Sequence, residues 1–181
     1  MKYILPLVFA LFFSACSVKY DTNAVVPTQN KKIFNLQKAI GNLSKDVNKE
    51  EAQKVAELSV VYSLELANQY ELISPPYLHN TLINMNIKER GLCYHFARDL
   101  VKELKKQNLQ TLDLRWAVHD TREDSEHNSV VVTSKNGSFE EGIVLDAWRD
   151  SGKLYWSYLK DDTHYDWKED IKDSKYYGTI K

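Results

Sequence analysis

The chain has 181 residues, of which 43% are hydrophobic and 12% are aromatic, enough to bury the core of one ordinary domain. Its 24 basic and 25 acidic residues almost cancel, which argues against nucleic acid as the main partner. Only two cysteines occur, Cys16 and Cys93, and Cys16 has a separate explanation, so we expect no internal disulfide.

The first fifteen residues are expected to be a signal peptide rather than part of the fold. Lys2 supplies a positive start, and the apolar run over 4–13 is too short to be a typical transmembrane span. Phe13-Ser14-Ala15-Cys16 follows, and it resembles the lipobox of bacterial lipoproteins. The resemblance implies cleavage before Cys16, lipid such as palmitate on that cysteine, and a domain held at a membrane of the bacterial cell envelope, outside the cytoplasm. An ordinary signal peptide, cut near Ala15, is the alternative.

A polar segment separates this leader from the expected domain. Residues 16–30 contain Pro27 and show no clear period, so we expect a flexible tether behind the lipid. One domain is then expected over 31–181.

Four helices are expected in the first half of that domain. Apolar side chains that recur every three to four residues predict helices over 31–44, 49–72, 76–85 and 93–107. Asn48 is a favourable cap for the second helix, and Ser74-Pro75-Pro76 cannot extend it. Gly91 marks a turn before the fourth.

The second half changes to strand patterns. Alternating or β-branched runs predict strands over 112–118, 128–133, 142–148 and 154–159. Lys135-Asn136-Gly137 is a hairpin signal, and this turn is expected to place residue 127 roughly opposite residue 145. Helices followed by an antiparallel meander predict an α+β fold. The tail after Asp161 is polar and aromatic and predicts no particular element.

Three residues with complementary chemistry fall at the ends of these elements. Cys93 opens the fourth helix, His127 lies where the second strand begins, and Asp146 lies towards the end of the third. A helix N-terminus and an imidazolium both favour a thiolate, and the helix offers the Cys93 amide as an oxyanion donor. His127 is then the general base and Asp146 the residue that orients its ring. Alternatively, Cys93 is a small buried residue and Asp146 forms a plain ion pair with Arg149.

The order and context of these residues resemble the transglutaminase-like and papain-like cysteine hydrolase superfamily over roughly residues 85–160. The matching pieces are Gly91-x-Cys93 with Ala97 and Leu100, His127 with Val130-Val131-Val132, and Leu145-Asp146-x-Trp148. The resemblance implies a transglutaminase-like fold, with the nucleophile at the N-terminus of a central helix, and acyl transfer through a thioester. A second oxyanion donor is usual in the superfamily, and the candidates are Asn86, Arg90 and Asn128.

Other residues are expected around the three, or offer alternative roles. Trp148 and His119 are expected to form the wall of the site, and His119 is an alternative base. Zinc bound by Cys93, His119 and His127 is another alternative, although no Cys-x-x-Cys or His-Glu-x-x-His spacing supports it, and we expect no metal.

The remaining histidines are expected to take no part in the chemistry. His95 follows Cys93 by two residues, so on a helix the two side chains point apart, and we expect packing or hydrogen bonding. His79 and His164 are expected at the surface. The acidic segment 120–126 is expected to be a loop beside His127.

Two functions from different classes remain open. The first is a membrane-anchored, thiol-dependent hydrolase or acyltransferase that acts as a monomer, without a cofactor, on amide bonds of peptides, proteins or the cell wall. The second is a non-catalytic envelope lipoprotein that uses the same fold to bind a protein or the cell wall.

Overall fold

The computed structural model describes residues 17–119 and 126–180. The expected signal peptide, Cys16 and most of the acidic segment 120–126 lie outside the described residues. The helices are α2 (Thr22–Gly41), α3 (Lys49–Gln69), α4 (Pro76–Asn84), α5 (Cys93–Lys105) and α6 (Ile171–Tyr176). The strands are β1 (Leu112–His119), β2 (His127–Ser134), β3 (Ile143–Asp146), β4 (Tyr155–Tyr158) and β5 (Lys168–Glu169). The predicted α+β class, with helices preceding an antiparallel sheet, is confirmed.

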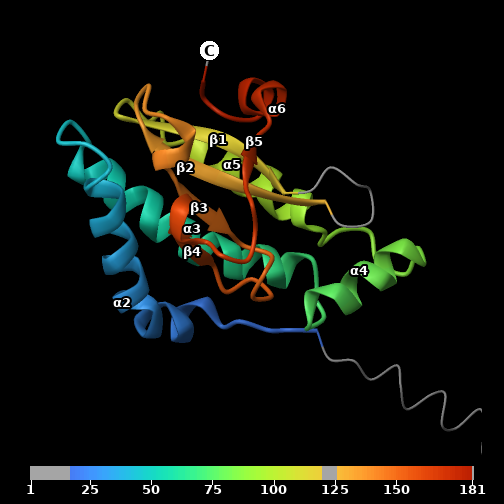
Figure 1. Cartoon of the computed structure of the whole chain (residues 1–181). Helices are drawn as coiled ribbons and strands as arrows, with labels where there is room; N and C mark the ends of the chain where they lie inside the picture. Colours follow the sequence, from blue (N-terminus) through green and yellow to red (C-terminus); the bar gives the residue numbers. More distant parts are fainter. Residues whose placement is uncertain (1–16, 120–125, 181) are drawn as a thin grey trace, which may run out of the picture.

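The five strands form one antiparallel sheet in the order β4-β3-β2-β1-β5. Helix α5 lies against β1 and β2, and α3 packs on α5, so the main core lies between the sheet and these helices (Figure 1). A smaller apolar cluster lies on the other face of the sheet and includes Val131, Val144 and Trp167. Because side chains alternate along a strand, β2 supplies both clusters.

Helix α5 forms because its apolar residues recur on one face. Phe96, Leu100 and Leu104 are four residues apart and are all buried against the sheet. Each such side chain contributes roughly 1.5–3 kcal/mol to folding. The helix that begins at Cys93 is therefore fixed firmly to the sheet that carries His127 and Asp146.

The segment expected to be a flexible tether is folded onto the domain. Ser17 forms an antiparallel bridge with Ile73. The Tyr20 amide donates to the Asn68 side-chain oxygen at 2.7 Å, and the Asn68 side-chain nitrogen donates to the Tyr20 carbonyl at 2.7 Å. These contacts are polar and depend on distant residues, so apolar periodicity does not reveal them.

Two other expectations need correction. Helix α2 begins at Thr22 rather than at 31, and it continues through Pro27. The hairpin is also longer than expected, because a 3-10 turn, η1 (Phe139–Glu141), lies between β2 and β3. Val130 therefore pairs with Leu145, and residue 127 lies beyond the point where β3 ends.

In the described residues no helix is both long enough and apolar enough to cross a bilayer.

Candidate active site

His127 and Asp146 lie together at one end of the sheet. His127 begins β2 and Asp146 ends the antiparallel neighbour β3, so both side chains come to the same edge. The Nε2 atom of His127 lies 2.7 Å from Oδ2 of Asp146, and both side chains are buried. The structure therefore brings together the two residues that the sequence separates by nineteen positions.

Asp146 is held as a carboxylate by several donors. Its Oδ1 accepts from the amides of Trp148 at 3.0 Å and Arg149 at 3.1 Å. Its Oδ2 accepts from the Arg149 Nε at 3.0 Å as well as from His127. Burial alone would raise the pKa of Asp146, but His127 and Arg149 hold it below its ordinary value. The carboxylate is thus ionised and fixed in direction.

The same pair favours a protonated imidazole. Burial alone would lower the pKa of His127, but the charge and hydrogen bond of Asp146 outweigh burial. Cys93 adds a smaller effect in the same direction, and the pKa of His127 rises to about 9. Because Nε2 is bound to Asp146, Nδ1 is the ring nitrogen that this bond leaves open.

Cys93 lies at the first position of α5, next to the start of β2. Its Sγ donates to the Glu126 carbonyl at 3.8 Å, and Glu126 directly precedes His127. The residue is 9% exposed. Among the residues that the structure describes, the amides of Cys93 and Tyr94 donate to no acceptor, so both are available to an anion at this helix end.

The side chain of His79 holds the loop before Cys93 in place. His79 was expected at the surface, yet it is fully buried. Its Nδ1 accepts from the Ile73 amide at 3.1 Å, and its Nε2 donates to the Arg90 carbonyl at 2.7 Å. Gly91 has φ +128° and lies so close that an added Cβ would be 2.4 Å from the His79 Nε2. The pair determines how the chain enters α5 at Cys93.

His95 caps the same helix. Its Nδ1 accepts from the amides of Gly91 and Leu92, each at 3.2 Å. Burial, with the nearby Arg90 and Arg98, lowers the pKa of His95 to about 4, so the ring is neutral and can accept. The structure gives His95 the hydrogen-bonding role expected for it, and His164 is exposed.

None of the three side-chain candidates for a second oxyanion donor hydrogen-bonds to Cys93 within the described chain. Asn86 lies in the exposed turn after α4. Arg90 forms an ion pair with Asp99 at 2.6 Å. Asn128 is buried, and its side chain bonds to the Trp116 Nε1 and to a Glu126 carboxylate oxygen, each at 2.7 Å. The free backbone amides at the start of α5 are the better donors.

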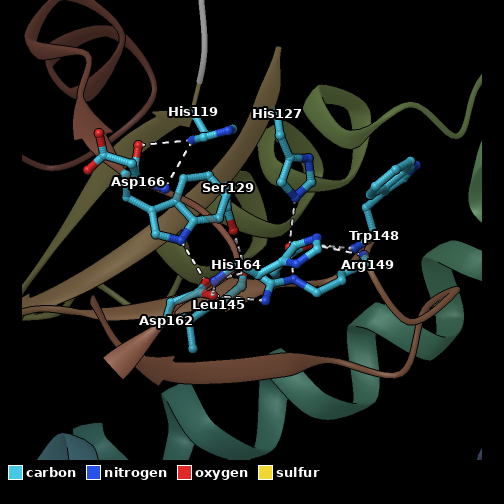
Figure 2. A network of polar contacts seen from close by, with 11 residues as sticks. His119, His127, Ser129, Leu145, Trp148, Arg149, Asp162, His164 and Asp166 are labelled. Carbon is cyan, nitrogen blue, oxygen red and sulfur yellow. Dashed lines mark hydrogen bonds and ion pairs between the residues drawn. The ribbon is translucent and has the colours of Figure 1, made fainter. Parts of the chain in front are cut away.

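Aromatic rings enclose His127. The ring of Trp148, expected in the site wall, lies 4.9 Å from it, and the rings of Tyr165 and Trp167 lie at 4.5 and 5.2 Å. His119, the other expected wall residue, pairs with His127 across β1 and β2. Its Nδ1 accepts from the Asp166 amide at 3.0 Å (Figure 2). The sequence did not predict Tyr165 and Trp167, and the only signal for them is the aromatic content of the tail.

Arg149 extends the network beyond Asp146. Its guanidinium binds both carboxylate oxygens of Asp162 at 3.2 and 2.6 Å (Figure 2). Trp167 Nε1 also donates to Asp162, at 2.8 Å. The centre of the Tyr155 ring lies 3.7 Å from the guanidinium carbon, Cζ, of Arg149. Asp146 thus has two side-chain partners at once, His127 and Arg149, besides the backbone amides of Trp148 and Arg149.

Over residues 17–119 and 126–180, no three histidine, cysteine or acidic side chains are grouped to hold a metal ion. Comparisons with protein families, with curated proteins and with solved structures found no match for this chain.

Proposed function

We propose that this chain is a thiol-dependent hydrolase or acyltransferase of transglutaminase-like fold that acts on amide bonds. The observation that carries the proposal is the buried His127–Asp146 pair, with the Cys93 thiol beside it at the N-terminus of α5. A positively charged imidazole next to a thiol at a helix N-terminus favours the thiolate. The α+β order, with this helix packed against the sheet, supports the family proposal.

The proposed reaction has two stages. The Cys93 thiolate attacks the amide carbonyl carbon, and the amides of Cys93 and Tyr94 stabilise the oxyanion. His127 gives its proton to the departing nitrogen, which leaves a thioester on Cys93 and a neutral imidazole. The imidazole then removes a proton from water or from an amine, and attack on the thioester releases the acyl group and restores the thiolate. Asp146 fixes the ring throughout.

The location belongs to the same proposal. The lipobox-like Phe13-Ser14-Ala15-Cys16 supports lipid attachment at Cys16 and a place in the bacterial cell envelope. Peptides, envelope proteins and cell-wall crosslinks supply the amide bonds available there.

A non-catalytic binding lipoprotein is the second candidate. It is favoured by the small exposure of Cys93 and by the commitment of Arg90 and Asn128 to other partners. The two candidates differ in whether the thiol is activated.

Alkylation of Cys93 by iodoacetamide distinguishes them. A soluble form that begins at Ser17 has Cys93 as its only thiol. We expect His127→Ala to slow alkylation at pH 6.5 by about tenfold or more, because the imidazolium no longer stabilises the thiolate. His164→Ala is the matched control, since His164 is exposed, and it leaves the rate unchanged. Slow alkylation that does not respond to His127→Ala would mark Cys93 as structural and favour the binding protein.

A further inference from the structure

The surface around α4 differs in composition from the rest of the chain. Residues 74–87 contain no Asp, Glu, Lys or Arg, although charged residues make up 27% of the sequence. This stretch is nevertheless exposed: Tyr77, Leu78, Met85 and Ile87 are 63%, 42%, 62% and 51% exposed. The described part of the chain has only four other exposed large hydrophobic residues, and these are spread over other elements. Four exposed apolar side chains within eleven residues, with no charged residue among them, are typical of a contact site.

Two of these side chains share a side of α4, and the other two flank them in the sequence. Leu78 and Met85 are seven residues apart, two helical turns, so they lie on the same side. The next residue after Leu78, His79, points about 100° away around the helix; it is buried and fixes the helix to the domain. We call Tyr77, Leu78, Met85 and Ile87 the α4 patch.

The described chain begins beside this patch. Ser17 is paired with Ile73, and the Val18 amide donates to the Leu72 carbonyl at 2.6 Å, only a few residues before α4 begins at Pro76. Figure 1 shows the start of the described chain and the start of α4 at the same corner of the molecule. Cys16 directly precedes Ser17 in the sequence. A lipid on Cys16 therefore leaves the domain next to the α4 patch.

This position constrains how an anchored domain can lie. With no tether between the lipid and the fold, the head-group layer must pass close to Ile73, and α4 is the adjacent exposed element. Lys88 forms an ion pair with Glu71 at 2.6 Å, and Lys19 also acts on that carboxyl, lowering its pKa after the effects of Lys88. The two lysines and Glu71 leave one net positive charge beside the anchor point, where lipid phosphates would be.

We propose that the α4 patch docks on the lipid surface of the membrane that holds the anchor. The inference rests on the lipid attachment in the proposed function and adds an orientation to it. Interfacial helices bury their apolar face about 5–10 Å into the boundary between head groups and acyl chains. Tyr77 packs on Trp148 at 5.0 Å, and Trp148 packs on His127, so docking places the candidate site close to the lipid. Substrates are then amides in membrane-proximal segments.

The test uses the full, processed protein reconstituted in vesicles of phosphatidylethanolamine and phosphatidylglycerol. Leu78→Cys and Met85→Cys are introduced singly in a Cys93→Ser background, and their labelling by a membrane-impermeant maleimide is timed. The matched controls are Phe34→Cys and Tyr176→Cys, exposed apolar positions on α2 and α6. Each rate is divided by the rate after unfolding in detergent, which removes differences in intrinsic reactivity and in vesicle sidedness.

We expect the two patch positions to react about tenfold more slowly than the controls, because lipid covers them. Equal rates at patch and control positions would overturn the proposal. Protection in native membranes but not in the vesicles would also overturn it, since a protein partner would then be the cover. An intact mass that lacks lipid on Cys16 would refute the anchor itself. Failure of the hydrolase proposal appears separately, in the alkylation of Cys93, and leaves the labelling result unaffected.

Discussion

Replacing Asp146 by asparagine tests the central ion pair with little change in side-chain size. The asparagine oxygen can still accept from the amides of Trp148 and Arg149, which bond to Oδ1 in the native protein. Its nitrogen would replace Oδ2, so an N–H would face the Arg149 Nε donor, and His127 would lose its counter-charge. The variant therefore removes the pair's charge interaction in a buried setting.

The size of the expected loss of stability follows from the pKa of His127. The pKa of His127 rises from its ordinary 6.5 to about 9, and a change of one pKa unit corresponds to about 1.4 kcal/mol, so the stabilisation is roughly 3 kcal/mol. Since the folded-state pKa is raised, this stability is fully present below pH 6.5 and is lost as the pH rises through 9. The Asp146 pKa is lowered, so its contribution is lost only on the acid side, below its ordinary value of 3.8.

Urea unfolding at a series of pH values measures the stability that the His127–Asp146 pair contributes. Both proteins begin at Ser17 and carry Cys93→Ser, which keeps thiol ionisation out of the alkaline range. We expect the free energies of unfolding of the reference protein and the Asp146→Asn variant to differ by about 3 kcal/mol at pH 6, and this gap to shrink by about 2–3 kcal/mol by pH 9.5. A gap that is constant across this range, or below about 1 kcal/mol at pH 6, would show that the two side chains do not form a charged pair.

Three further predictions concern the surroundings of the site. Arg149→Met is expected to cost about 3–5 kcal/mol, and combining it with Asp162→Asn to cost at least about 1 kcal/mol less than the sum, which a double-mutant cycle measures. Gly91→Ala is expected to lower the melting temperature by several degrees, since the added Cβ meets a buried imidazole at a positive φ, whereas Gly41→Ala, with open space around it, is neutral or stabilising. Leu100→Ala is expected to lose about 2–5 kcal/mol in chemical denaturation, and a loss below 1 kcal/mol would contradict its place in the core.

The features that the sequence predicted well are those set by neighbouring residues. The pattern Phe96, Leu100 and Leu104 specifies both the existence of α5 and the face that it buries, and it places Cys93 at the helix start. The β-branched run around Val131 likewise predicts β2. From these local signals the helices-then-sheet order follows, whereas the register expected to bring His127 opposite residue 145 was wrong.

What the sequence did not predict depends on contacts between distant segments. Tyr165 and Trp167 contact His127 from an irregular stretch, so no helical or strand periodicity in the sequence predicts their position. His79 looks like a surface residue of a short helix, and only the carbonyl of Arg90 explains its burial. The pairing of β2 with β3 is shifted because a 3-10 turn absorbs residues that a tight hairpin would not.

The cover over His127 comes from a late part of the chain, and this affects the order in which the site is completed. Cys93, His127 and Asp146 are all synthesised before Asp162, Tyr165 and Trp167, which bind Arg149 and enclose the imidazole. A chain interrupted after β4 would contain every proposed reacting group but would leave the imidazole open to water. Incomplete copies would therefore lack the cover over His127 and be more accessible to proteases, so the fold would complete this site only in finished molecules.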